Sequence, residues 1–191
     1  TLGAGVRVAG RRLAIVSNAG GPGTLAADHA TDRWLQLAEL APETRGVLAA
    51  LLPAGAKHDN PVYVRGDADA AMFEATVRTC LEDPGVDALL AIMAPHALTD
   101  PDAFAQALIG IAANHGKPLF TCWMGGESVA ASRSRFATHR IPTYATPEAA
   151  VDAIAALGMF AANQQLLLQA PEPLSANSAP DRDAARSIVD A

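Results

Sequence analysis

Short, continuously apolar runs alternate along this chain with longer segments in which apolar residues recur at helical spacing. The clearest apolar runs are RLAIVS (12–17), VDALLAIM (86–93) and LFTCWM (119–124). Such runs are typical of strands that are buried on both faces of a parallel sheet. Weaker strand candidates are WLQLAEL (34–40), PVYV (61–64) and the segment 141–144.

A helix is predicted after each of these strands. Apolar residues and helix-start signals indicate helices over 24–33, 42–52, 67–82, 100–115, 127–139 and from 146 to about 169. Pro42, Pro101 and Pro147 each fall at a first helical position, where the missing N–H is tolerated, and Thr146 is a suitable N-cap. The alternation predicts an open, mainly parallel sheet with helices on both faces, a three-layer αβα architecture.

The length and composition fit one domain with a tail. The chain has 191 residues, half of them hydrophobic, which is enough for a single core. The stretch 171–191 is rich in Pro, Ser, Asn and Asp and is predicted to be a flexible linker toward a following domain. Residues 1–10 are predicted to be a linker from a preceding domain, which leaves 11–170 as the folded unit.

Charge and cysteine content argue against several classes of partner. A net charge of −6 with scattered arginines disfavours nucleic-acid binding, and no apolar run is long enough to predict a membrane span. Cys80 and Cys122 are too few for a disulfide framework, so we expect reduced thiols in a cytoplasmic protein. No cluster of ligand side chains predicts a metal site.

The segment after the first strand carries the strongest functional signal. Ligands of open α/β sheets bind beyond the carboxyl ends of the strands, and Asn18-Ala-Gly-Gly-Pro-Gly-Thr24 lies at such an end. Glycines let the backbone approach a ligand, and a helix beginning near Thr24 would offer the N–H groups of Gly23, Thr24 and Leu25 to an anion. The candidate phosphate-binding residues are Asn18, Gly20, Gly21, Gly23 and Thr24. The spacing matches neither a P-loop nor a dinucleotide fingerprint, so a tight structural turn is the alternative.

Other strand ends supply residues that could line the same site. These are Asn60, Tyr63, His96, Gly125 and Gly126. The Gly125–Gly126 pair is a second candidate anion cradle, although a plain turn is the favoured interpretation. No Ser/His/Asp set or similar catalytic constellation is recognisable, so no catalytic residue is assigned within the chain.

Five ordered motifs resemble one module of the NDP-forming acyl-CoA synthetases. They are RLAIVSNAGGPGTLAAD, NPVYVRGD, LEDPGVDALLAIMAPHALTDP, KPLFTCWMGGESVA and RIPTYATPEAAVDAIAAL, which together span about residues 8 to 160. The module is the succinyl-CoA-ligase-like domain, and the resemblance implies a flavodoxin-like fold. That fold agrees with the strand–helix alternation.

The resemblance also implies an activity for the larger protein. Enzymes of this family make acyl-CoA from a small carboxylic acid such as acetate, CoA and ATP through a phosphohistidine, and they use Mg and release ADP. The helix from Thr24, with its Gly20–Gly23 loop, would help hold the phosphoryl group of that histidine. Partner CoA-binding and ATP-grasp domains would supply the histidine, which is expected upstream, and the nucleotide site. We therefore expect no tightly bound cofactor in this domain and no activity of the isolated fragment.

Two further features bear on which members of this family the chain resembles. Tyr63 stands where the family commonly has the Asp of Asn-Pro-Val-Asp. The tract NQQLLLQAPEPLS (163–175) resembles bacterial proteins in which such a synthetase array is fused to a protein-lysine acetyltransferase. The alternative function is therefore a regulatory module of an acetyltransferase.

Overall fold

Three long parallel strands form the centre of the sheet. They are β1 (Arg12–Ser17), β4 (Ala88–Met93) and β5 (Leu119–Trp123). The structure, a computed structural model, describes residues 5–97, 99–168 and 186–188. All six residues of β4 and all five of β5 are buried, because helices cover both faces of the sheet. The continuous apolar runs of the sequence thus mark the central strands.

Shorter strands complete the sheet at its two edges. They are β2 (Gln36–Leu37), β3 (Val62–Tyr63) and β6 (Thr143–Tyr144), and the order is β2-β1-β4-β5-β6. Strands β2 and β3 share one edge of β1, since β2 pairs with its first residues and β3 with its last. If β2 and β3 are counted as one strand and the strands are renumbered along the chain, the order is 2-1-3-4-5, which is that of the predicted flavodoxin-like fold.

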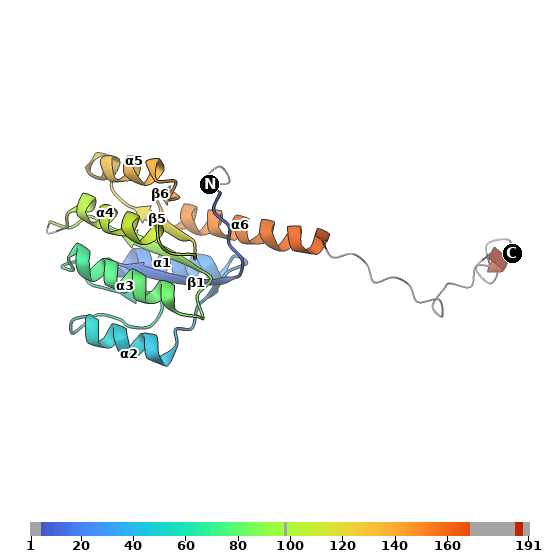
Figure 1. Cartoon of the computed structure of the whole chain (residues 1–191), viewed down its shortest axis with the longest axis horizontal. Helices are drawn as coiled ribbons and strands as arrows, with labels where there is room; N and C mark the ends of the chain where they lie inside the picture. The colour runs from blue at the N-terminus through green and yellow to red at the C-terminus, as the bar shows by residue number, and fades with distance from the viewer. Residues whose placement is uncertain (1–4, 98, 169–185, 189–191) are drawn as a thin grey trace.

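Helices lie on both faces of this sheet (Figure 1). One face carries α1 (Gly20–Thr31) and α6 (Pro147–Leu168), which pack on each other over the core cluster that includes Leu13, Ile15 and Phe120. The other face carries α2 (Pro42–Leu51), α3 (Ala70–Glu82), α4 (Pro101–Ala112) and α5 (Ala130–Thr138), the last preceded by the short 3₁₀ helix η2 (Glu127–Val129). The predicted three-layer architecture is confirmed.

Polar side chains begin three of the helices. The carboxylate of Asp69 accepts a hydrogen bond from the N–H of Met72, and that of Asp100 accepts from the N–H groups of Asp102 and Ala103. Thr146 Oγ1 accepts from the N–H of Ala149 at 3.3 Å, which confirms its predicted role at the start of α6.

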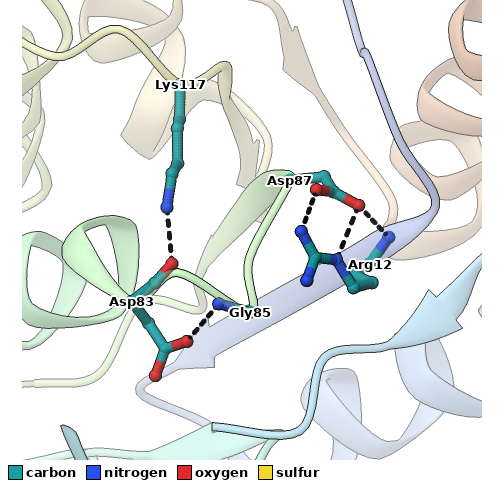
Figure 2. Close-up of polar contacts among 5 residues, drawn as sticks. All are labelled: Arg12, Asp83, Gly85, Asp87 and Lys117. Carbon is teal, nitrogen blue, oxygen red and sulfur yellow. Dashed lines mark hydrogen bonds and ion pairs between the residues drawn. The ribbon is translucent and has the colours of Figure 1, made fainter. Parts of the chain in front are cut away.

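Two aspartates fix the amino-terminal ends of the central strands (Figure 2). Arg12, the first residue of β1, binds Asp87 through both its guanidinium group and its backbone N–H. Asp83 is 1% exposed, and its carboxylate accepts from the N–H groups of Ala41 and Gly85. The ammonium group of Lys117 donates to the Asp83 backbone oxygen. These contacts fix the start of β4 against β1.

Helix α6 runs beyond the body of the domain (Figure 1). Its first turns bury Ala150, Val151 and Ile154, whereas Leu167 and Leu168 near its end are 86% and 84% exposed. By length and composition alone the helix could cross a membrane, a test that core helices of soluble proteins also pass. The predicted linker 171–191 lies outside the described residues apart from 186–188. At the other end of the chain Val8 is 1% exposed, so the second half of the predicted 1–10 linker packs on the domain.

Several predicted boundaries were wrong. Helix α1 begins at Gly20 rather than near Thr24, so the glycine-rich segment is the first turn of the helix and not a loop before it. The predicted strand 34–40 is reduced to Gln36–Leu37. Trp34 lies just before it and packs its ring against Gly158 of α6, where an added Cβ would come within 2.5 Å of a ring carbon.

Candidate functional site

The first turn of α1 presents backbone N–H groups at the carboxyl end of β1. Ala19 is the N-cap residue, and the first helical hydrogen bond runs from the N–H of Gly23 to the oxygen of Ala19. The N–H groups of Gly20 and Gly21 precede that bond and have no partner within the helix, while Pro22 has no N–H. Gly20 and Gly21 are exposed, and a Cβ added to either would meet nothing within 4 Å. The first turn contains no acidic residue, so the positive end of the helix dipole faces open space.

Gly23 has a different role from the two glycines before it. It is buried, and a Cβ at this position would lie 3.3 Å from the Cβ of Ser17 and 3.8 Å from that of Pro61. Its lack of a side chain lets α1 pack closely on β1. The predicted use of the Gly23, Thr24 and Leu25 N–H groups is wrong. The helix starts four residues before Thr24, so these N–H groups lie inside the helix and not at its free first turn.

A pocket of about 210 Å³ opens beside this turn. It is lined by Ser17, Ala19, Gly20, Gly23, Thr24, Lys57, Pro61, Val62 and Tyr63. The pocket therefore brings together the start of α1, the end of β1 and the segment around β3. A larger pocket of about 430 Å³ lies at the opposite edge of the sheet, and none of the predicted site residues lines it.

Asn18 lies behind the pocket and not in it. The side chain is 1% exposed, and its amide nitrogen donates to the oxygen of Ala94 while its amide oxygen accepts from the Ala94 N–H. These bonds tie the end of β1 to the end of β4. Asn18 thus shapes the carboxyl edge of the sheet, and its side chain is not free to bind phosphate.

Asn60 also has a structural place. Its Oδ1 accepts from the N–H of Ile15 at 2.9 Å, and its Nδ2 donates to the oxygens of Leu13 and Ala38. The side chain thus hydrogen-bonds to backbone groups of β1 at the part of its edge that lies between β2 and β3. Asn60 is absent from the residues that line the described pocket, and its side-chain oxygen and nitrogen are both bonded to backbone groups.

Tyr63 lines the pocket as predicted, and the structure adds Lys57 beside it. The two residues form an isolated antiparallel pair, with N–H to oxygen distances of 3.1 Å in both directions. Lys57 is not among the predicted site residues. It sits in a loop without a recognisable motif, and only its pairing with Tyr63 places it here.

His96 is exposed at the end of β4 and lies against Gly66. A Cβ on Gly66 would come within 2.9 Å of His96 Nε2, so the ring rests directly on the backbone that follows β3. Gly66 follows Arg65, which has the unusual φ of 77° and is held by a bidentate ion pair with Asp67. His96 is close to the site but does not line the pocket.

Gly125 and Gly126 form a turn. Gly125 has a φ of 111°, and its oxygen accepts from the guanidinium group of Arg133. The 3₁₀ helix that follows has three residues and begins with Glu127, whose carboxylate disfavours an anion there. The turn interpretation, and not the second anion cradle, fits this geometry.

The remaining chemistry of the described residues is limited. No group of three His, Cys, Asp or Glu side chains in this part of the chain could hold a metal ion. Cys80 and Cys122 are buried in the core clusters on opposite faces of the sheet, and burial raises the pKa of each thiol to about 12. The arrangement can bind an anion but contains no assembled set of catalytic side chains.

Curated relatives of this chain are archaeal ligases. The chain is 38% identical over 148 residues to an acetate–CoA ligase (ADP-forming) I of Archaeoglobus fulgidus, a match that covers 78% of this chain and 21% of the relative. It is 36% identical over 158 residues to the alpha subunit of acetate–CoA ligase (ADP-forming) II of Pyrococcus furiosus, covering 81% and 35%. The chain thus spans a fifth to about a third of the length of these relatives.

Solved structures show the same domain. A crystal structure of a Pyrococcus horikoshii protein superposes with a TM-score of 0.76 at 34% identity and covers 81% of this chain and 36% of that one. A dinucleotide-forming acetyl-coenzyme A synthetase 1 of Ca. Korarchaeum cryptofilum, in complex with phosphate and ADP, gives 0.75 at 30% identity, covering 85% and 36%. The Ligase-CoA domain family matches residues 13–167. This chain belongs to the Ligase-CoA domain family.

Proposed function

We propose that this domain holds the phosphoryl group of a phosphohistidine at the first turn of α1 during acyl-CoA formation. The larger enzyme would make acyl-CoA from a small carboxylic acid, CoA and ATP. The phosphorylated histidine would come from another domain, and its phosphoryl oxygens would accept hydrogen bonds from the N–H groups of Gly20 and Gly21.

The observation that carries the proposal is the open start of α1. Two consecutive exposed glycines leave the N–H groups of the first turn accessible, and no acidic side chain occupies the turn. Backbone donors at a helix N-terminus favour phosphate, because the donors are fixed and the helix dipole is positive there. Fixed donors of this kind stabilise the charge on a transferring phosphoryl group without having to reorganise during the reaction.

The comparisons support a phosphate ligand for this domain. The Ca. Korarchaeum cryptofilum synthetase was solved with phosphate and ADP, and this chain aligns with it at 30% identity. The named curated relatives are ADP-forming acetate–CoA ligases, which favours acetate or a similar acid as the substrate of the larger protein.

Other domains would provide the rest of the active site. A CoA-binding domain and an ATP-grasp domain, on the same chain or a partner subunit, would bind CoA, ATP and Mg, and a subunit name among the relatives is consistent with such a division. The domain itself would bind no cofactor tightly, no nucleic acid and no membrane, and the enzyme would act in the cytoplasm. Tyr63, Thr24 and Lys57 would line the space around the phosphoryl group.

The proposal is tested with Gly21→Asp and Gly21→Asn in the complete ligase that contains this domain. A side chain fits at Gly21 without a clash, so both variants are expected to fold. The Asp carboxylate would occupy the phosphoryl position and repel it. Acyl-CoA formation should therefore fall by about 100-fold or more, as for loss of a principal electrostatic contact.

The Gly21→Asn variant is the control of equal size and no charge. It should keep activity within about tenfold of the unsubstituted enzyme, because it adds bulk without adding charge. Wild-type turnover in a folded Gly21→Asp enzyme would show that the phosphoryl group does not rest at this helix end.

A further inference from the structure

One residue with a formal charge lines the pocket beside α1. Of its nine lining residues, Lys57 is the only cation, and no Asp or Glu lines it. The walls consist otherwise of backbone, hydroxyl groups and small apolar side chains. A lysine in the pocket wall and the free N–H groups at the start of α1 both contribute positive potential to this space.

The loop that carries Lys57 is fixed at several points. Lys57 is paired with Tyr63 through two backbone hydrogen bonds of 3.1 Å. Residues directly opposite in an antiparallel pair project their side chains to the same side, so the Lys57 and Tyr63 side chains leave the backbone together on one side. The N–H of Ala56 also bonds to the oxygen of Pro53, and Arg65 donates to the oxygen of Ala54. The position of Lys57 is thus determined by the fold of the loop.

The carboxylate nearest to Lys57 in the sequence and the first carboxylate after β3 are each paired with an arginine. Asp59 pairs with Arg45 at 3.6 Å, and Asp67 pairs with Arg65 at 2.9 Å. Among the described ion pairs none links Lys57 to a carboxylate. Its ammonium group can therefore serve as the counter-ion of a ligand without breaking an internal salt bridge.

We infer that Lys57 is a binding residue for the phosphoryl group, and that it supplies the full positive charge that the helix end lacks. The inference rests on the proposed function, since it uses the same pocket. The ligand class is a doubly charged phosphoryl group, either that of phosphohistidine or a phosphate of CoA. A singly charged carboxylate gains less from Lys57, because Coulomb attraction scales with the charge of the ligand.

The experiment is a titration of the 191-residue chain with inorganic phosphate, followed by the amide NMR signals of Gly20 and Gly21. Four proteins are compared: the unsubstituted chain, Lys57→Gln, Lys57→Arg and Arg78→Gln. The Arg78 variant removes the same positive charge from α3, on the opposite face of the sheet. Parallel titrations use acetate and coenzyme A as ligands.

In the unsubstituted chain, phosphate is expected to move both glycine signals. Lys57→Gln should weaken phosphate binding by about tenfold, as expected for the loss of a charge-assisted contact. Lys57→Arg should restore most of the phosphate affinity, and the phosphate affinity of Arg78→Gln should stay within about twofold of that of the unsubstituted chain. The affinity for acetate should fall less in Lys57→Gln than the affinity for phosphate does. If coenzyme A binds more tightly than phosphate and shows the same dependence on Lys57, its phosphates are the source of the ligand group. If it does not, phosphohistidine is the source.

The outcomes separate the two proposals. Equal phosphate affinity of the unsubstituted chain and Lys57→Gln, with both glycine signals still moving, would overturn the role of Lys57 and leave the helix site intact. An absence of any shift at Gly20 and Gly21 in the unsubstituted chain would overturn both. An unchanged pattern of dispersed amide signals in each variant checks that the fold is preserved.

Discussion

The side chain of Asn60 serves as a hydrogen-bond partner for the backbone of Ile15 in the middle of strand β1. The Oδ1 atom accepts from the Ile15 N–H at 2.9 Å, while Nδ2 donates to the oxygens of Leu13 and Ala38. Strand β1 is therefore paired along one edge by β2, then by one side chain, then by β3. A continuous partner strand would have supplied the same groups from its backbone.

Asn60→Ala is expected to lower the free energy of unfolding by about 2 kcal/mol, because the buried N–H of Ile15 loses its partner and the oxygens of Leu13 and Ala38 each lose one hydrogen bond. Asp59→Ala is the neighbouring control. Its side chain is 80% exposed and makes one long ion pair, so its effect should stay below about 0.5 kcal/mol. Urea unfolding of both variants measures the difference, and equal effects would show that the Asn60 bonds do not support β1.

The Arg12–Asp87 pair makes stability depend on acid (Figure 2). The hydrogen bond from the Arg12 guanidinium lowers the pKa of Asp87 below its ordinary value, although partial burial opposes the shift. Because the native pKa lies below the unfolded one, the unfolded chain takes up the proton first as the pH falls. The contribution of the pair is therefore complete above about pH 5 and is lost as the pH falls through the lowered pKa.

We expect the midpoint of urea unfolding to fall on acidification, and to fall less steeply in Asp87→Asn. Arg12→Gln should flatten the profile less than Asp87→Asn, because the backbone N–H of residue 12 still donates to Asp87, and the double variant should resemble Asp87→Asn, because no carboxylate is left to titrate. Asp83 contributes in the same direction: burial raises its pKa, but hydrogen bonds from Thr44, Ala41 and Gly85 together outweigh burial and lower the pKa below its ordinary value. A profile as steep in Asp87→Asn as in the original chain would contradict the role of this pair.

The thiols of Cys80 and Cys122 are expected to be unreactive in the native chain. Burial raises the pKa of each to about 12, so almost no thiolate is present at neutral pH. A thiol reagent should modify neither residue in buffer at neutral pH and both in denaturant. Rapid modification of one thiol under native conditions would show that its core cluster opens locally.

The three glycines of α1 are expected to respond differently to alanine. Gly20→Ala and Gly21→Ala place a Cβ in open space and should raise stability by up to about 0.5 kcal/mol, since alanine favours the helix. Gly23→Ala brings a Cβ to 3.3 Å from Ser17, whose hydroxyl is bonded to Ala19 and whose strand cannot move easily. A net loss of about 1 kcal/mol is expected, and thermal unfolding of the three variants would show the contrast.

The isolated chain is expected not to be phosphorylated. Under the proposed function, the phosphorylated histidine and the nucleotide site would both lie on other domains. Incubation with labelled ATP and magnesium should leave the chain unlabelled. Stable label on His58 or His96 would contradict the assignment of the phosphohistidine to another domain.

The central strands and most helices could be predicted because their signals are local. The apolar runs of β1, β4 and β5 exist only where helices cover both faces of a sheet, and Pro42, Pro101 and Pro147 fix the starts of three helices. The start of α1 was misplaced because glycine and proline usually interrupt helices. In the structure these residues nevertheless form the first turn of α1, where Gly23 is buried and packs beside Ser17.

The site could be predicted only in part, because it depends on contacts between distant segments. Gly20, Gly21 and Thr24 were identified from their place after a strand, and Tyr63 from its place at a strand end and in the Asn-Pro-Val-Asp motif. The roles of Asn18 and Asn60 depend on backbone groups of other strands, with which their side chains bond in the structure. Lys57 reaches the pocket through its backbone pairing with Tyr63, and no local sequence pattern predicts that pairing.

The two edges of the sheet have a consequence for how the molecule behaves at high concentration. Strands β2, β3 and β6 are two residues long, and the edge formed by β2 and β3 is interrupted by Asn60 and Pro61. An exposed edge recruits a strand from another molecule only when it offers a continuous row of free backbone groups. Edges this short offer no such row, so the fold protects its own apolar strands from joining into intermolecular sheets and fibrils.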